Sequence, residues 1–208
     1  MQRCVIVGAA PIADYERVRS FLQKGDFFIF CDAGLSHAQK LGVQPNLIIG
    51  DFDSFKNPNL EVETIVLPSH KDDTDVFFAA KEAVQRGFED FLFLGVIGAR
   101  FDHSLCNISV LLFLDDLKKN AVIVDDFSIL KIISGQKNFI EDDCEFFSLM
   151  CVEGAAEGVT IKNAEYNLKN AFIKPSYQYT ISNKVVLGKK AEVCIKKGRL
   201  LLVKVFVV

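Results

Sequence analysis

Residues 1–126 alternate short apolar runs with amphipathic segments, and this alternation limits the possible folds more than any other feature of the chain. The runs are apolar on both faces and are mostly bounded by Gly, Asp or Pro, as in parallel strands that are covered from two sides. We expect strands at residues 3–8, 27–31, 46–50, 64–67, 90–95 and 121–124. Helical stripes lie between them, formed by Val76, Ala80, Ala83 and Val84 and by Leu105, Ile108 and Leu112. Alternating strands and helices predict a wound α/β domain with a mostly parallel sheet.

From residue 127 onward the helical stripes disappear. Short strand-like runs follow one another, separated by turns of Gly, Asn, Asp or Lys, and include residues 177–183 and 184–188. This pattern is typical of an all-β sandwich. We therefore expect two domains, at residues 1–126 and 127–208.

The composition excludes several classes of protein. A formal net charge of −3 argues against a nucleic-acid-binding protein, which would carry a basic face. No apolar run is long enough to span a bilayer. The six cysteines lack metal-binding spacing and mostly lie among apolar residues, so we expect buried, reduced thiols. These features predict a cytoplasmic protein that binds neither nucleic acid nor membrane.

Acidic residues gather where the predicted strands end. Ligands of open α/β sheets bind beyond the carboxyl ends of the strands, so these side chains should share one edge. They are Asp32, Asp51, Asp53, Asp72, Asp73 and Asp75. Two carboxylates at about 4 Å repel by about 4 kcal/mol at an effective dielectric constant near 20, which favours a bound cation. Because Cys and His are absent from these motifs and all donors are oxygens, the pattern favours Mg²⁺ over zinc.

Groups that attract phosphate lie beside these acids. Lys71, Arg100 and His103 are cationic or can become so, and helices are expected to begin after Thr74 and after Phe101, where free N–H groups attract anions. Mg²⁺ commonly shares its coordination sphere with substrate phosphates. The combination predicts a site for a nucleotide polyphosphate.

Each motif also has a simpler interpretation when taken alone. Asp51 and Asp53 could form a solvated turn, and residues 71–75 could be an acidic helix start capped by Thr74 or Asp73. The stretch "VGAAP" at 7–11 resembles a nucleotide-binding turn only faintly, and His37 is expected on a helix surface. Because the acidic motifs occur at successive strand ends, we favour the joint interpretation.

Three segments together resemble the bacterial thiamine pyrophosphokinase family. They are "CDAGLSHAQKLGVQPNLIIGDFDS", "KDDTDVFFAAKEAVQRG" and "GVIGARFDHSLCNISVL", with a weaker match in "YTISN". The resemblance implies an α/β domain followed by a β-sandwich, in a homodimer with active sites at the subunit interface. It also implies transfer of pyrophosphate from ATP to thiamine, which gives thiamine diphosphate and AMP.

The resemblance assigns roles to individual residues. It implies Mg²⁺ binding by Asp51, Asp53 and Asp75, with help from Asp72 and Asp73. It implies nucleotide contacts by Asp32, Gly34, Arg100, His103 and Asn107, with Asp102 beside the phosphates, and Lys71 is expected at the nucleotide because of its charge. It implies that Ser182 and Asn183 of the β domain contact the pyrimidine ring of thiamine.

Other functions remain possible from the sequence. A pyrophosphokinase for another heterocyclic alcohol, such as a hydroxymethylpterin, could use the same α/β edge. A Mg²⁺-dependent phosphatase would need the first Asp of its DxD motif as nucleophile in a DxDxT-like setting, whereas Ser54 and Phe55 follow here. A non-catalytic nucleotide sensor would not need the complete set of charged groups.

Overall fold

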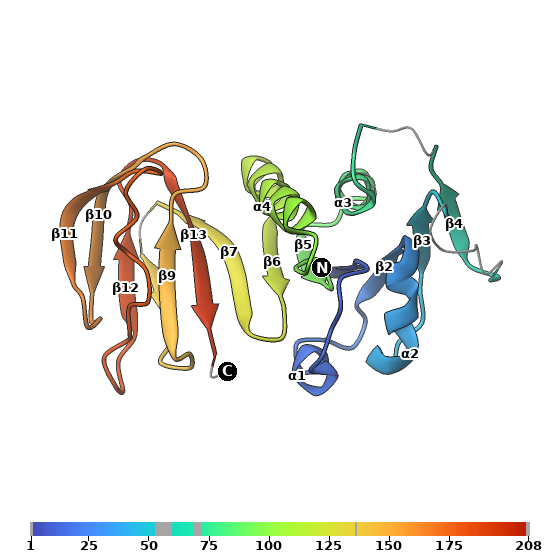
Figure 1. Ribbon diagram of the computed structural model, residues 1–208, viewed down its shortest axis with the longest axis horizontal. Coiled ribbons are helices and arrows are strands. Elements are labelled where there is room, and N and C mark those ends of the chain that lie inside the picture. Colours follow the sequence, from blue (N-terminus) through green and yellow to red (C-terminus); the bar gives the residue numbers. More distant parts are fainter. Residues whose placement is uncertain (1, 53–59, 69–71, 136, 207–208) are drawn as a thin grey trace. The chain divides into compact units, whose positions relative to one another are not determined.

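The computed structural model describes residues 2–52, 60–68, 72–135 and 137–206. The chain divides into two compact units, Met1–Asp126 and Phe127–Val208, which we call unit 1 and unit 2 (Figure 1). We describe each unit by itself.

Unit 1 contains a parallel sheet with the strand order β4-β3-β2-β1-β5-β6. Its strands are β1 (Cys4–Val7), β2 (Phe27–Cys31), β3 (Leu47–Gly50), β4 (Glu63–Val66), β5 (Asp90–Leu94) and β6 (Asn120–Val124). The side chains of β1 are buried on both faces, as the continuous apolar runs predicted. The predicted wound, mostly parallel α/β architecture is confirmed.

Helices cover both faces of this sheet, with α3 and α4 on one side and α1 and α2 on the other (Figure 1). The helical elements are α1 (Tyr15–Ser20), the 3-10 helix η1 (Asp32–His37), α2 (Ala38–Leu41), α3 (Asp75–Gln85) and α4 (Phe101–Asp116). Helix α3 begins at Asp75 because the Thr74 hydroxyl accepts the amide of Phe77, at 3.2 Å. Its buried face includes Ala80 and Ala83, as predicted.

The apolar stripe predicted for α4 is not its buried face, so that prediction is wrong. Leu105 is 54% exposed, whereas the buried face carries two polar residues near its start. The buried residues are Ser104, Asn107, Val110, Leu111 and Leu114. Ser104 and Asn107 are buried because both make hydrogen bonds to the loop after β5, so an apolar stripe could not reveal this face.

Unit 2 is built from two antiparallel sheets, with strand orders β7-β13-β9 and β11-β10-β12-β8. The strands are β7 (Ser128–Ser134), β8 (Asn138–Ile140), β9 (Phe146–Met150), β10 (Ala156–Lys162), β11 (Leu168–Ile173), β12 (Ala191–Cys194) and β13 (Arg199–Val205). Side chains from both sheets, such as Leu149 of β9 and Val193 of β12, share one core. The predicted all-β sandwich is thereby confirmed.

The strands predicted at 177–183 and 184–188 are not formed. These residues make only isolated bridges, such as Phe147 with Asn183 and Ala164 with Val185. Ser182 has a left-handed backbone, with φ of 56°, which interrupts a regular ladder.

None of the six cysteines forms a disulfide, as predicted. The expected burial holds for Cys4, Cys31 and Cys151, whereas Cys106, Cys144 and Cys194 are half-buried. Among the described residues, no helix combines the length and apolar character that a membrane crossing requires.

Candidate active site

A pocket of about 590 Å³ lies in unit 1, beyond the carboxyl ends of β1, β2, β3 and β5. The chain fills the sheet from β1 outward to β4 and later returns to place β5 on the other side of β1. This reversal is a topological switch point, where diverging loops leave room for a ligand. The pocket therefore lies where the wound topology predicts one.

Close backbone packing forms the floor of the pocket. A methyl group on Gly34 would lie 2.6 Å from the carbonyl oxygen of Val7, so only glycine lets η1 cross the end of β1. Gly95 has a φ of 60°, and a methyl group there would lie 2.7 Å from the carbonyl oxygen of Gly8. Gly34, predicted near the nucleotide, thus shapes the floor and is itself buried.

Four of the predicted acidic residues line this pocket from three loops. They are Asp32, Asp51, Asp73 and Asp75. Asp32 begins η1 with a left-handed φ of 44°, Asp51 follows β3 directly, and Asp75 is the first residue of α3. Asp73 forms an ion pair with Lys81.

Not all residues of the predicted acidic motifs are described in this pocket. Asp72 is exposed and does not line it. Asp53 and Lys71 lie outside the described residues, so their predicted roles stay predictions.

The lining carboxylates suit a hard divalent cation. All four are oxygen donors, which Mg²⁺ prefers, while Cys31 and His103 also line the pocket. Across residues 2–52, 60–68, 72–135 and 137–206, no three Asp, Glu, His or Cys side chains are grouped closely enough to hold an ion by themselves. Mg²⁺ commonly takes one or two protein carboxylates and completes its sphere with water and phosphate oxygens, so the donor set fits such an ion.

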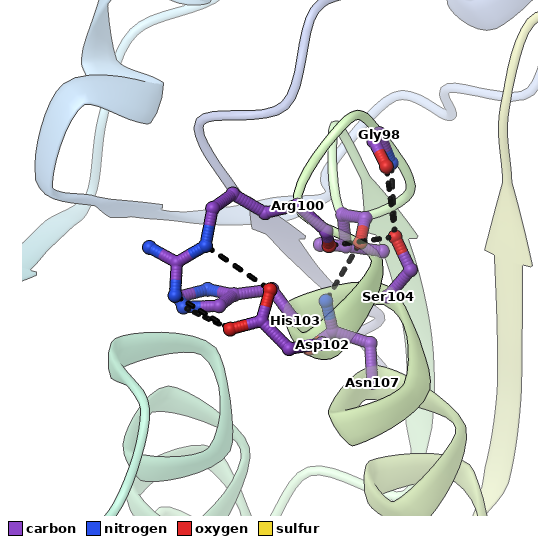
Figure 2. Close-up of polar contacts among 7 residues, drawn as sticks. Gly98, Arg100, Asp102, His103, Ser104 and Asn107 are labelled. Carbon is purple, nitrogen blue, oxygen red and sulfur yellow. Dashed lines mark hydrogen bonds and ion pairs between the residues drawn. The ribbon is translucent and has the colours of Figure 1, made fainter.

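Arg100 and His103 also line the pocket, and they lie beside Asp102 at the start of α4 (Figure 2). The guanidinium of Arg100 donates to both oxygens of Asp102, at 3.1 and 2.6 Å, and His103 Nε2 lies 4.0 Å from Asp102 Oδ2. Arg100 lowers the pKa of Asp102 to about 2. Asp102 is exposed and does not line the pocket. An exposed pair of this kind contributes little to stability, so Arg100 can turn to a phosphate at little cost.

Two buried side chains of α4 shape the loop after β5, as Figure 2 shows. Asn107 Nδ2 donates to the carbonyl of Val96 at 2.7 Å, and Ser104 Oγ accepts the amide of Gly98 at 3.1 Å. Asn107 lines the pocket as predicted for a nucleotide contact, although its amide also anchors the loop that carries Arg100. The sequence interpretation missed Ser104, because a single serine within an apolar helix carries no signal.

The segment Gly8–Pro11 also lines the pocket, although its sequence resembled a nucleotide-binding turn only faintly. Behind it lies His37, which is 7% exposed, so the expectation of a helix-surface residue is wrong. Its ring bonds to Tyr15 Oη at 2.6 Å and to the carbonyl of Ala10 at 3.1 Å. The short η1 helix packs against β1, β2 and β3, which turns His37 inward.

In unit 2, Ser182 and Asn183 differ in burial and in their hydrogen bonds. Ser182 is exposed, and its amide donates to Ser148 Oγ at 3.0 Å. Asn183 is 3% exposed; its amide donates to the carbonyl of Tyr166 at 2.8 Å and accepts from the amide of Tyr166 at 3.0 Å. Asn183 therefore fixes the backbone of Tyr166, whose side chain is 62% exposed.

Sequence comparisons assign both units to one family. The family described as "Thiamin pyrophosphokinase, catalytic domain" matches residues 18–124, and "Thiamin pyrophosphokinase, vitamin B1 binding domain" matches residues 137–200. Thiamin pyrophosphokinase 1 of Caenorhabditis elegans is 22% identical over 204 residues, covering 89% of this chain and 82% of the relative.

Solved structures of similar proteins share the fold. Thiamine pyrophosphokinase from Bacillus subtilis superposes with a TM-score of 0.86 at 20% identity, with 100% of both chains covered. The yeast enzyme gives a TM-score of 0.78 at 15% identity and covers 99% of this chain and 86% of the other. The catalytic-domain match alone spans about half of the chain and includes the ends of β2, β3 and β5 at the pocket. The chain belongs to the thiamin pyrophosphokinase family.

Proposed function

We propose that this protein transfers pyrophosphate from ATP to the hydroxyl group of thiamine, giving thiamine diphosphate and AMP. The observation that carries this proposal is one pocket whose lining includes both acidic side chains and the basic residues Arg100 and His103, all of these residues within the segment that matches the catalytic domain. Carboxylates for a metal and cations for phosphates are the groups that phosphoryl-type transfer requires.

The proposed reaction is one displacement at the β-phosphorus of ATP. The thiamine oxygen forms a new P–O bond in line with the bond to the oxygen that bridges the α- and β-phosphates. That bridging bond breaks, and its oxygen leaves with AMP. The hydroxyl proton passes to an acceptor, for which an aspartate of the pocket is the candidate.

The chain's own residues hold the reacting groups in this mechanism. Asp51 and Asp75, together with Asp53, would hold Mg²⁺, which when bound offsets the negative charge of the phosphates. Arg100 exchanges its exposed contact with Asp102 for a phosphate oxygen, and Lys71 is expected to assist. The amide groups at the start of α4 add a favourable dipole. Positioning of this kind supplies much of the acceleration in phosphoryl transfer.

We assign thiamine recognition to unit 2. The match of residues 137–200 to the vitamin B1 binding domain supports this assignment. Ser182 offers an exposed hydroxyl for the pyrimidine ring, beside the turn that Asn183 holds through Tyr166.

Incubation of the purified chain with Mg-ATP and thiamine tests the proposal. We expect thiamine diphosphate and AMP in equal amounts, measured by chromatography. Hydroxymethylpterin in place of thiamine tests the alternative alcohol, and release of inorganic phosphate without ATP would indicate a phosphatase. Nucleotide binding without turnover of either alcohol would contradict the proposal in favour of a sensor.

We further propose a cytoplasmic homodimer whose active sites lie at the subunit interface. The free cysteines support a reducing compartment. Exposed aromatic side chains of unit 2 support association, since Phe172, Tyr177 and Tyr179 are each more than 40% exposed. Light scattering should give twice the mass of one chain, and a monomer that is fully active at assay concentration would contradict the dimer.

A further inference from the structure

The segment Gly8–Asp14 leaves β1 and forms one wall of the pocket through Gly8–Pro11. Its backbone is held at several points. The amides of Gly8 and Ala10 donate to the carbonyls of Leu94 and Gly95, at 2.9 and 2.8 Å. The amides of Ala13 and Asp14 donate to the carboxylate of Asp126, both at 2.9 Å. These bonds fix both ends of the segment.

The carbonyl of Ala10 is fixed separately, by His37. A carbonyl oxygen can only accept, so the His37 Nε2 that lies 3.1 Å from it carries the hydrogen. In the neutral ring Nδ1 then holds the lone pair and accepts from the Tyr15 hydroxyl at 2.6 Å. Tyr15 thus selects the tautomer that can reach Ala10. Burial lowers the pKa of His37, which favours this neutral form. The hydrogen bond to Ala10 opposes this shift in pKa, and the nearby Lys40 adds to it.

The direction of this carbonyl matters for an anionic ligand. Ala10 lines the pocket, whereas His37 is not among the described residues that do. The hydrogen bond holds the Ala10 oxygen next to His37, a residue that does not line the pocket. A carbonyl oxygen turned into the pocket would present its negative end to phosphate oxygens, which repel it.

We propose that His37 is a positioning residue for the nucleotide, and that it holds the Ala10 carbonyl and the Gly8–Pro11 wall in the arrangement that accepts a triphosphate. The inference rests on the nucleotide site of the proposed function. His37 touches neither the nucleotide nor thiamine. It acts through the backbone of Ala10, and Tyr15 acts through His37.

Replacement of His37 by two different residues tests the bond to Ala10. His37→Leu removes the donor, whereas the amide of His37→Gln extends far enough to replace Nε2. The probe is Mg²⁺ with α,β-methylene-ATP, in which the bond that breaks during transfer is replaced. By calorimetry, His37→Leu should raise the Kd of this analogue about tenfold, as expected for the loss of one hydrogen bond that fixes a backbone carbonyl. His37→Gln should restore most of the affinity. The Kd of Tyr15→Phe should lie between the Kd values of His37→Gln and wild type.

A stability control separates positioning from general damage. Asp26, at the other end of the sheet, bonds Arg3 at 2.7 Å and has a side chain that is 2% exposed. Asp26→Asn should lower the melting temperature and leave the Kd unchanged. In activity assays, His37→Leu should raise the KM for ATP and leave the KM for thiamine unchanged.

Equal Kd values for wild type, His37→Leu and Tyr15→Phe would overturn the inference. If His37→Leu does not fold, the Gln and Phe variants decide alone, and a Tyr15→Phe protein with wild-type affinity would overturn it. Binding of the analogue by a wild-type chain that forms no thiamine diphosphate would contradict the proposed function while leaving this inference intact. A wild-type chain that does not bind the analogue would overturn both.

Discussion

The predicted site residues of unit 1 and unit 2 differ in what their polar atoms contact. In unit 1, most of the predicted charged side chains line a pocket. In unit 2, the amide of Asn183 is already bonded to the backbone of Tyr166. The difference teaches that a charged motif at a strand end tends to face a ligand, whereas a buried amide often shapes the backbone that does so. Variants in unit 1 should therefore impair the reaction itself, and variants in unit 2 should mainly affect thiamine binding and folding.

The largest effect on turnover is expected for the carboxylates that line the pocket. Asp75→Asn keeps the shape of the first residue of α3 but removes a charge that would hold Mg²⁺. We expect kcat to fall at least about a hundredfold with the melting temperature nearly unchanged, because such charges act on the developing transition state. Coupled detection of AMP and a thermal melt measure both.

Asp72→Asn is the matched control for this variant. Its side chain lies three residues away, is exposed and does not line the pocket. Its kcat should stay within about twofold of wild type, in keeping with the small effects of exposed substitutions. Equal losses at positions 72 and 75 would remove the distinction between lining and exposed acids.

A smaller effect on turnover is expected at Arg100. Arg100→Ala should lower kcat about tenfold to a hundredfold, since one charge-assisted contact to phosphate is lost. Asp102→Asn frees Arg100 from an exposed partner, and activity should change by less than about threefold. A larger loss for Asp102→Asn than for Arg100→Ala would show that Asp102 acts directly on the substrate.

The thiamine side should behave differently. Ser182→Ala should raise the KM for thiamine several-fold without loss of stability, because its hydroxyl is exposed. Asn183→Ala should raise the same KM and also lower stability by about 1 kcal/mol, since it leaves the amide and carbonyl of Tyr166 unpaired. Urea denaturation beside steady-state kinetics separates the two. An Asn183→Ala protein with wild-type stability would contradict the structural part of its role.

The sequence predicts which segments of unit 1 form strands. The order of those strands in the sheet follows from the sequence less directly than the position of the site does. Continuous apolar runs reveal the strands, and the rule that ligands bind at their carboxyl ends brings Asp32, Asp51 and Asp75 together without coordinates. Mutual repulsion then indicates a cation. Charged residues at strand ends are thus the feature of such a protein that is most easily predicted from its sequence.

Side chains that support the site from behind are harder to predict. Ser104 and Asn107 are polar residues on the buried face of α4, so periodicity alone selected the exposed Leu105 instead. His37 is turned inward by the short η1 helix, which has no stripe of its own. In unit 2, residues 177–188 have strand composition but follow an irregular path through the left-handed Ser182. These features depend on tertiary contacts that no local pattern contains.

The smallest predicted effect is a pH dependence of stability that His37 contributes. Burial lowers the pKa of His37 below its usual value of 6.5, so between the two values the unfolded chain binds more protons than the folded chain. Stability from His37 is therefore fully present above pH 6.5 and is lost as the pH falls toward the folded pKa. Of the groups around the ring, Tyr15 has a raised pKa and does not titrate in this range, while Lys40, and Asp126 near Tyr15, are present in wild type and variant alike. Urea titrations of wild type and His37→Gln over this range isolate the effect, because the carboxylates common to both proteins cancel in the difference. Wild type should lose more stability than His37→Gln on acidification, and parallel curves would mean that His37 titrates as freely in the folded chain as in the unfolded one.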